Sequence, residues 1–296
     1  MTGSEGPIRR VAVVIPACDE EERVGRCLAS VAAAIMKLHV FAAPEAVDDP
    51  VPPLGIGGMT VTVVLAADAC TDRTVEVARQ AWVEAGLPPG RATLEVLEGR
   101  WRSAGGARAA AAGHAVGVEP RPEWLASTDA DTAVPPNWLE YQLDRAAEGV
   151  DAVLGTVEPD PQECPEPVYR LWQREHTLAE GHPHIHAANM GVRVGAYERA
   201  GGFPAVECSE DEALVGSLRG LGARIEATDR IRAITSGRLE GRAELGFAHH
   251  LQSLAQLAGT PAGPASTTEP GQHFADRRNA CATTPAAGYG DEESNV

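Results

Sequence analysis

Lysine is almost absent from this sequence, because Lys37 is the only one in 296 residues and arginine supplies the other basic residues. The 25 basic residues stand against 42 acidic ones, which gives a formal net charge of −17. Such a balance argues against a nucleic-acid-binding face, which needs clustered positive charge. The six cysteines are not closely paired in the sequence, so their spacing predicts neither a zinc site nor a disulfide framework.

Long apolar runs are missing as well. The first residues lack the apolar segment of a signal peptide, since Arg9 and Arg10 lead directly into a short strand. The longest apolar stretches elsewhere are too short to cross a bilayer. We therefore expect no transmembrane segment, and a cytoplasmic protein or one bound peripherally at the inner face of a membrane.

Short apolar or β-branched runs do occur, and they alternate with stretches of helical periodicity. The predicted strands cover residues 11–15, 61–67, 92–97, 124–128, 152–157 and 187–194, with one or two more within 224–235. This alternation predicts right-handed βαβ units, and hence an α/β fold with a mostly parallel sheet. After Ala258, Pro, Gly, Ser and Thr dominate and no periodicity remains, so a disordered tail is expected there.

Asp129 and Asp131 stand between the strand at 124–128 and a helix that Pro135 and Pro136 are suited to begin. The carboxyl ends of strands in an open α/β sheet are where ligands bind. Two carboxylates this close repel each other unless positive charge lies between them, and a hard divalent cation would supply it. An acidic turn before a helix would explain the same residues without a ligand.

The small residues Gly105 and Gly106, followed by Arg108, stand before an alanine-rich helix. Free amides at such a helix start attract phosphate, and Arg108 would reach a diphosphate. A flexible connection, with Arg108 on a solvated face, accounts for them equally well.

His182, His184 and His186 alternate in an extended segment, so their side chains would share one side and could bind a metal. Loop histidines without a ligand are the simpler explanation.

Ser209 and Glu212 have the spacing of a capping box at a helix start. That interpretation leaves Glu210 and Asp211 free at the helix N-terminus, where their ionised forms are stabilised.

Taken in order, several motifs resemble the family 2 glycosyltransferases of the GT-A fold, from about Val11 to Phe247. The motifs are Val-Val-Ile-Pro-Ala-Cys-Asp-Glu-Glu at 13–21, the segment 65–74, Asp129-Ala130-Asp131, Gly-Gly-Phe-Pro at 201–204 followed by Ser-Glu-Asp-Glu at 209–212, and Thr-Ser-Gly-Arg at 235–238 with Gly241-Arg242. The sequence departs from the family pattern at Cys18, Asp19 and Ala67, where the family usually has an aromatic residue, an asparagine and an aspartate. The nucleobase contact that the family makes in the second of these motifs falls on Asp68.

The resemblance implies a single Rossmann-like GT-A domain with a mostly parallel central sheet. Its expected parts are a flexible N-terminus (1–10), a nucleotide-sugar donor half (11–134), an acceptor half (135–257) and a disordered tail (258–296). The donor residues it implies are Pro16, Ala17, Glu20, Asp68, Arg108, Asp129 and Ala130. Asp129 and Asp131 would bind Mg²⁺ or Mn²⁺, and Asp211 would be the catalytic base. The acceptor residues we infer are His186, Asn189, Glu210, Arg238 and Arg242.

The implied activity is metal-dependent transfer of a hexose from a UDP- or GDP-sugar to a hydroxyl group, with inversion. The acceptor would be a small molecule or a lipid-linked one, and Arg238 and Arg242 favour an anionic acceptor because arginine pairs well with phosphate or carboxylate. The alternatives are a sugar-nucleotide-binding protein without turnover, a retaining GT-A transferase and a nucleotidyltransferase.

Overall fold

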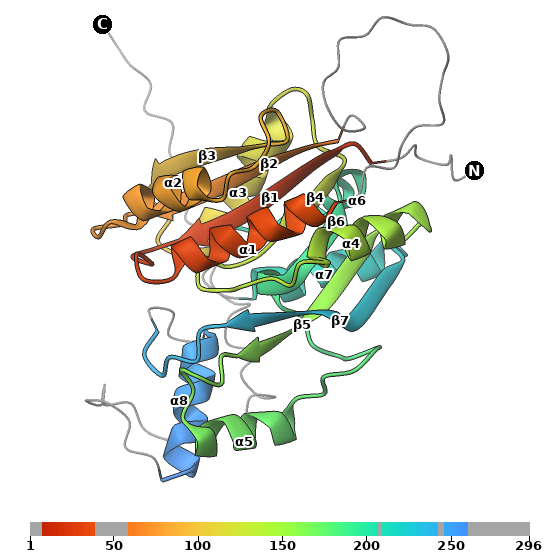
Figure 1. Ribbon diagram of the computed structural model, residues 1–296. Helices are drawn as coiled ribbons and strands as arrows, with labels where there is room; N and C mark the ends of the chain where they lie inside the picture. The colour runs from red at the N-terminus through yellow and green to blue at the C-terminus, as the bar shows by residue number, and fades with distance from the viewer. Residues whose placement is uncertain (1–7, 39–58, 207–208, 242–245, 260–296) are drawn as a thin grey trace, which may run out of the picture. The chain divides into compact units, whose positions relative to one another are not determined.

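The apolar runs of the sequence form a seven-stranded sheet in the order β3-β2-β1-β4-β6-β5-β7 (Figure 1). The strands are β1 (Arg10–Ala17), β2 (Thr60–Asp68), β3 (Ala92–Gly99), β4 (Trp124–Ser127), β5 (Ala152–Pro159), β6 (Met190–Arg193) and β7 (Ile225–Thr235). β6 is antiparallel to β4 and β5, and the other neighbouring strands are parallel. This computed structural model describes residues 8–38, 59–206, 209–241 and 246–259.

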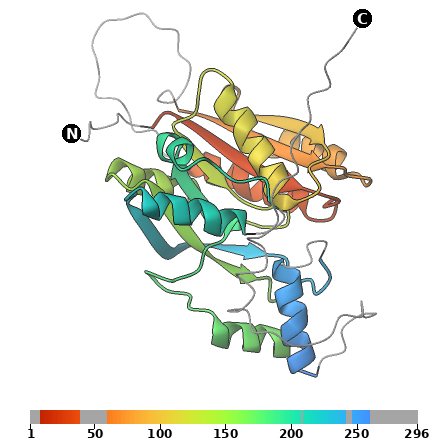
Figure 2. The ribbon, with the colours of Figure 1, turned by 180° about the vertical axis from the view of Figure 1, so that it is seen from behind.

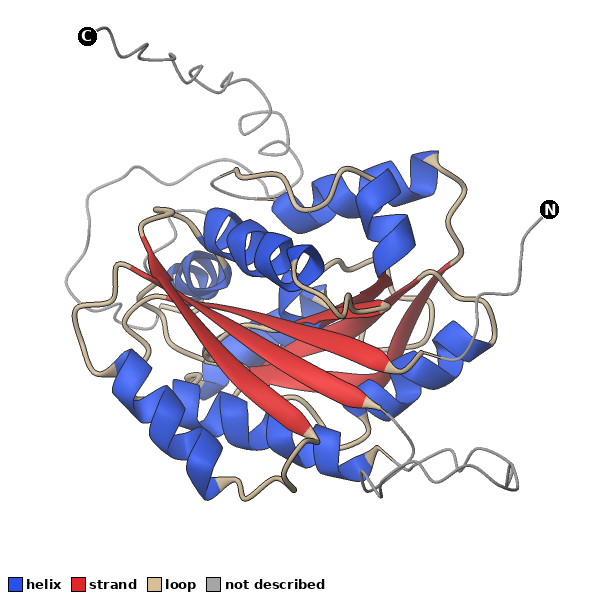
Figure 3. Cartoon of the chain, turned by 90° about the horizontal axis from the view of Figure 1, so that it is seen from above, coloured by secondary structure: helices blue, strands red, loops and turns tan. Residues whose placement is uncertain are grey.

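Helices cover both faces of the sheet. They are α1 (Val24–Lys37), α2 (Thr74–Glu84), α3 (Ala104–Gly117), α4 (Trp138–Ala147), α5 (Glu166–Glu175), α6 (Val194–Arg199), α7 (Glu210–Gly220) and α8 (Phe247–Leu257), with a short 3₁₀ turn η1 (Ala187–Asn189). Figure 1 shows α1, α2 and α4 on one face, and Figure 2 shows α3 and α7 on the other. The twisted sheet lies between these two layers (Figure 3).

The first strand shows why the sheet is buried on both sides. Val11, Val13 and Ile15 pack in the core beneath α1, whereas Ala12 and Val14 pack in the core beneath α3. Side chains of a strand alternate between its two faces, so an unbroken apolar run fits a strand covered on both. The α/β fold with a mostly parallel sheet is therefore confirmed.

A third apolar cluster joins α5 to α8. Its buried members are Cys164, Val168, Trp172, Leu251, Leu254 and Ala255. The two helices contact each other, and Figure 1 shows them beyond β5 and β7. Among the described residues, no helix has the length and apolar character that crossing a membrane requires.

Two local predictions were wrong. The strand expected at 187–194 is split into η1, the short antiparallel β6 and the start of α6. Segment 176–186 returns from α5 without a crossover helix, so β6 runs in the opposite direction to its neighbours β4 and β5. The capping box is also absent, because Ser209 has a left-handed backbone (φ 61°) and its side chain caps no amide.

Candidate active site

Acidic residues gather where β1, β2 and β4 end. These strands are parallel neighbours, and Ala17 at the end of β1 is paired with Ala67 of β2. Glu20, Asp68 and Asp129 follow or complete the three strands. The predicted ligand edge of the sheet is therefore the edge at which this chain concentrates carboxylates.

Asp129 and Asp131 form the corner after β4, and an arginine contacts each of them. Arg108 donates from Nη2 to Oδ1 of Asp129 (2.8 Å), and Arg238 donates from Nη2 to Oδ2 of Asp131 (3.1 Å). The Thr235 hydroxyl donates to Oδ1 of Asp131 (3.2 Å). Burial, followed by the negative charge of Asp129, raises the pKa of Asp131 to about 6 although Arg238 opposes the shift.

This corner fits a hard divalent cation. Its ligand atoms are carboxylate oxygens, the type that Mg²⁺ and Mn²⁺ prefer. No described residue donates to Oδ2 of Asp129, whose side chain is 35% exposed. Burial and the neighbouring Asp129 both disfavour the charged form of Asp131, and a bound cation would favour it.

A separate trio, Asp19, Cys70 and Asp72, has ligand atoms within 4.8 Å of one another. The carboxylates of Asp19 and Asp72 already accept hydrogen bonds from backbone amides. The Thr71 amide donates to Oδ1 of Asp19 (2.6 Å), and the Glu21 amide donates to Oδ2 of Asp72 (2.9 Å). We interpret these contacts as a clamp between the loops after β1 and β2.

Glu20 and Arg238 meet across the predicted boundary between the donor and acceptor halves. Both guanidinium Nη atoms of Arg238 donate to the Glu20 carboxylate, at 2.9 and 2.5 Å. The backbone amide of Glu20 donates to the Thr74 hydroxyl (2.7 Å), and Glu20 is 6% exposed. Arg238, predicted to bind the acceptor, therefore lies against the donor-side acids Glu20 and Asp131.

Asp68 is buried at the end of β2. Its Oδ1 accepts the backbone N–H of Trp101 (2.6 Å), so a nucleobase would have to use the other oxygen. Of the remaining donor predictions, Pro16 and Ala17 are buried in β1, and Ala130 is 2% exposed between the two aspartates. Their backbone, rather than their side chains, is what they offer to a ligand.

Arg108 and Glu210 are buried together. Arg108 donates from Nε to Oε1 of Glu210 (3.1 Å) and from Nη1 to the Ser127 hydroxyl (2.9 Å). The side chains of Arg108 and Glu210 are 3% and 9% exposed. Neither side chain is presented to solvent, although a diphosphate role was predicted for one and an acceptor role for the other.

Asp211 is the second residue of α7. Its Oδ2 accepts the backbone N–H of Ala187 (2.9 Å), and its Oδ1 accepts that of Glu212 (2.8 Å). Burial, and then the charge of Glu210, raises the pKa of Asp211 to about 6. A carboxylate with this pKa is ionised at neutral pH and can still take up a proton, as a general base must.

The remaining acceptor predictions have different outcomes. Asn189 is fully buried, and its amide is held by Trp138 Nε1 (2.8 Å) and by the carbonyl oxygens of Thr156 (2.8 Å) and Ile231 (2.6 Å). It therefore joins β5, β7 and α4, and we do not retain it as an acceptor residue. Arg242 lies outside the described residues.

His186 belongs to a group that we name the histidine column: His176, His182, His184, His186 and His250. Ring centroids are 6.0 Å apart for His184–His186, 5.1 Å for His176–His184 and 5.4 Å for His176–His250. The ring of His176 also stacks on Trp172 (4.4 Å).

Burial lowers the pKa of His186 to about 3. The predicted shared side of His182, His184 and His186 is confirmed as stacked rings, and no metal-ligand trio occurs among these described histidines.

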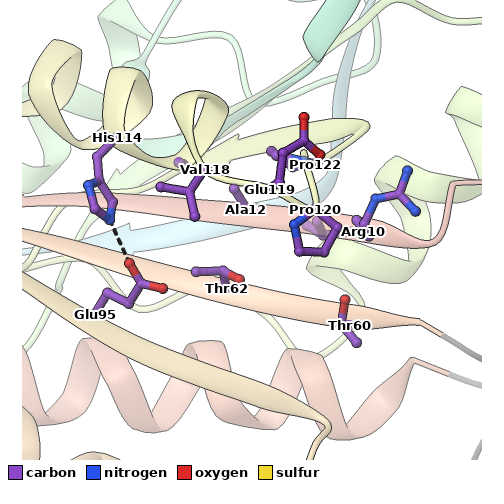
Figure 4. A pocket seen from close by; sticks show the side chains of 12 residues that line it. Arg10, Ala12, Thr60, Thr62, Glu95, His114, Val118, Glu119, Pro120 and Pro122 are labelled. Atoms are coloured by element: carbon purple, nitrogen blue, oxygen red, sulfur yellow. Dashed lines mark hydrogen bonds and ion pairs between the residues drawn. The ribbon is translucent and has the colours of Figure 1, made fainter.

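Among the described residues, hollows lie near both ends of the sheet. One, of about 380 Å³, lies at the carboxyl ends of β2 and β3 and is lined by Ala67, Ala69, Cys70, Asp72, Val75, Glu98, Gly99 and Arg100. The other, of about 120 Å³, lies at the opposite end of β1 and β2. Figure 4 shows Thr60 and Thr62 along it and His114 of α3 pointing at Glu95 of β3, with 2.6 Å between Nε2 and the carboxylate. The hollow at the carboxyl ends is therefore the one that adjoins the acidic edge.

Comparison with known proteins identifies the family. The family model described as Glycosyl transferase family 2 matches residues 12–199, which include the Asp129–Asp131 corner. The chain belongs to glycosyl transferase family 2. Among curated proteins, none matches the sequence.

Solved structures of glycosyltransferases share the fold of this family 2 chain. TarS of S. aureus (residues 1–349, in complex with UDP-GlcNAc) is 16% identical, with a TM-score of 0.52 over 84% of this chain and 66% of that one. The mannosyltransferase PcManGT of Pyrobaculum calidifontis, in complex with GDP-Man and Mn²⁺, is 18% identical, with a TM-score of 0.50 over 88% of this chain and 66% of that one. The GT-A fold is thereby confirmed for a chain that spans about two thirds of these two structures.

Sequence reasoning missed two acids of the loop after β5. Arg26 of α1 donates to Oδ2 of Asp160 (2.5 Å), and the Ser236 hydroxyl donates to Oε2 of Glu163 (2.7 Å). These contacts fasten the segment that carries Arg238 to the rest of the site. A proline-rich connection gives no periodic signal, so only the three-dimensional arrangement reveals them.

Proposed function

We propose that this family 2 protein transfers a sugar from a nucleotide-diphosphate sugar to an acceptor hydroxyl group, with Asp211 as general base and with inversion at the anomeric carbon. The observation that carries the proposal is the state of Asp211. It is held by two backbone amides at the start of α7, and its pKa is raised to about 6.

The donor class is supported by two lines of reasoning. The carboxyl edge of a parallel sheet is the usual place for a nucleotide, and this edge carries Glu20, Asp68 and the Asp129–Asp131 corner. TarS and PcManGT, which share the fold, are bound to UDP-GlcNAc and to GDP-Man. At 16% and 18% identity they do not select the base or the sugar for this chain.

In the proposed reaction, the acceptor oxygen attacks the anomeric carbon from the face opposite the diphosphate. The new carbon–oxygen bond forms as the bond to the diphosphate oxygen breaks, and the bonding electrons leave with the nucleoside diphosphate. Asp211 takes the proton of the acceptor hydroxyl and becomes neutral. Ala187 orients the carboxylate through its amide, so one oxygen of Asp211 is fixed before the acceptor arrives.

Asp129 and Asp131 are the residues that would hold Mg²⁺ or Mn²⁺. When bound, such a cation supplies positive charge that stabilises the departing diphosphate. Arg238 lies beside both Glu20 and Asp131, and we propose that its guanidinium serves the diphosphate as well.

The acceptor is less defined than the donor. The predicted anionic acceptor rested on two arginines, and Arg238 is paired with donor-side acids in the structure. The prediction now rests on Arg242 alone. We therefore propose an acceptor hydroxyl without assigning the charge of the molecule that bears it.

A direct test is nucleoside diphosphate release with Mg²⁺ or Mn²⁺, measured over a panel of UDP- and GDP-sugars and hydroxyl acceptors. We expect release that requires the cation, and a product of inverted anomeric configuration. Pyrophosphate release would indicate nucleotidyl transfer, and a retained configuration would remove Asp211 from its role as base. Cation-dependent nucleotide binding without any turnover would identify a binding protein instead.

A further inference from the structure

A single buried guanidinium joins the two functional ends of the site. Three nitrogen atoms of Arg108 each donate to a different side chain, namely those of Glu210 (3.1 Å), Ser127 (2.9 Å) and Asp129 (2.8 Å). The plane of the group also lies near the Phe203 ring, with 5.9 Å from Cζ to the ring centroid. Arg108 is 2% exposed, so its partners are fixed rather than shared with water.

The two acids that Arg108 holds come from distant parts of the chain. Asp129 follows β4 and is the exposed half of the candidate cation corner. Glu210 opens α7, and the next residue is the candidate base Asp211. The spacing between the cation corner and the base therefore depends on one side chain of α3.

The backbone around Arg108 is shaped for the same contact. A Cβ atom on Gly105 would lie 2.6 Å from the carbonyl oxygen of Val206 and 3.3 Å from the Glu210 side chain. Only glycine lets the segment before α7 approach α3 this closely. Gly105 thus admits a protein segment at the place where the sequence predicted a phosphate.

We propose that Arg108 is a positioning residue that sets the distance between the cation-binding corner and the general base. This inference rests on the proposed transfer reaction. The planar guanidinium suits the task, because it presents donors in fixed directions to two carboxylates at once, which the point charge of lysine does not. As a diphosphate ligand, Arg108 would have to leave these partners and become exposed.

The test compares Glu210→Gln and Arg108→Lys with the full-length wild-type chain. Removing Arg108 altogether would take its partner from the buried carboxylate of Glu210 and risks misfolding, whereas Glu210→Gln keeps an acceptor oxygen for Nε. Glu198→Gln is the matched control, since Glu198 forms an exposed pair with Arg121. The probes are UDP-GlcNAc and GDP-mannose with Mn²⁺, water serves as acceptor, and UDP and GDP affinities are measured separately.

We expect kcat for donor hydrolysis to fall about a hundredfold in Arg108→Lys, because a single ammonium does not reproduce the three contacts of the guanidinium and an error of about 1 Å in the base has that effect. The fall should be smaller in Glu210→Gln, which keeps an acceptor oxygen for Nε. In both variants the donor KM and the UDP or GDP affinity should change less than about twofold. Amide hydrogen exchange of Ala187 and of the first turn of α7 should accelerate in the apo protein, since Asp211 accepts the Ala187 amide. Unchanged kcat and unchanged exchange would overturn the inference. Loss of UDP or GDP affinity in Arg108→Lys, with kcat preserved, would overturn the inference and identify Arg108 as a diphosphate ligand.

Failure of the proposed function gives a different result. If wild-type protein hydrolyses neither donor, the transfer reaction is not supported. Hydrogen exchange still decides whether Arg108 and Glu210 hold the start of α7, because that readout needs no substrate. A positioning role survives only with both the exchange change and the fall in kcat.

Discussion

At the carboxyl edge of the sheet, buried acids are held beside arginines, whereas the histidine column holds rings that contact mainly one another. Arg108 joins Asp129 to Glu210, and Arg238 joins Glu20 to Asp131. In the column, burial lowers the pKa of His176, His184, His186 and His250. One region pairs its charges, and the other favours the neutral form of these four rings.

The two regions therefore respond to acid in opposite directions. The pKa of Asp211 is raised from 3.8 to about 6. Between these pH values the folded protein holds a proton on Asp211 that the unfolded chain has released, so the contribution of Asp211 to stability is complete below 3.8 and is lost as pH rises through 6. The pKa of His186 is lowered from 6.5 to about 3, so its contribution is complete above 6.5 and is lost as pH falls toward 3. Mild acid favours the folded acids and opposes the folded histidines.

The largest effect should come from removing the base at the charged edge. Asp211→Asn keeps the shape of the side chain but cannot accept the proton of the acceptor, so kcat should fall about a thousandfold. The wild-type kcat should rise with pH through about 6, as Asp211 ionises, and this limb should vanish in the variant. Donor binding with Mn²⁺, measured by calorimetry, should remain; its loss would make Asp211 a binding residue.

The next prediction breaks the histidine column. Its central ring, His176, stacks on both Trp172 and His184, and His176→Phe keeps a ring that cannot be protonated. Each proton that the unfolded chain binds in excess lowers the stability by about 1.4 kcal/mol per pH unit. Between pH 6.5 and 4.5 the variant should lose less stability than wild type. Urea unfolding followed by tryptophan fluorescence measures the difference.

Tyr197→Phe is the control for this experiment, because Tyr197 is also a buried ring but lies outside the column, against Phe203. Neither phenol nor phenyl titrates between pH 6.5 and 4.5, so the unfolding of this variant should keep the wild-type dependence on pH. Identical pH slopes in wild type and in His176→Phe would mean that burial of the column does not control its protonation.

The third prediction tests whether Arg238 serves the donor or the acceptor. Arg238→Ala removes charged hydrogen bonds to Glu20 and Asp131, so the donor KM should rise about tenfold while the acceptor KM stays near the wild-type value. Arg230, with a side chain 69% exposed, provides a control substitution that should change neither constant. A raised acceptor KM alone would restore the prediction made from sequence.

Much of the charged edge was predictable, because its residues lie in short motifs. The Asp129–Asp131 corner follows an apolar run directly, and Asp211 follows a turn signal at a helix start. The partner of Asp129 was not predictable, since Arg108 is 21 residues away and Glu210 is 102 residues from Arg108. Periodicity indicates which face of an element is buried, but it does not specify which elements meet.

The histidine column shows the same limit more sharply. The alternation of His182, His184 and His186 indicated their shared side. His176 ends α5 and His250 lies in α8, and nothing in either segment predicts that they join the same stack. Asn189 shows a related limit, because a polar residue that bonds carbonyl groups of two strands is indistinguishable in sequence from one that faces a substrate.

The smallest predicted effect supplies a reference that depends on neither charge nor protonation. Ala69, beside Asp68 at the hollow after β2, has a left-handed backbone with φ 51°. An L-residue with a Cβ atom is disfavoured there by about 1 kcal/mol, and glycine is not. Ala69→Gly should therefore raise the free energy of unfolding by up to about 1 kcal/mol, equally at pH 7.5 and pH 5. Ala109→Gly within α3 should lower it by about 1 kcal/mol. A stabilisation by Ala69→Gly that changed with pH would mean that the strained turn is coupled to the acids of the charged edge, of which Asp68 is its neighbour in the chain.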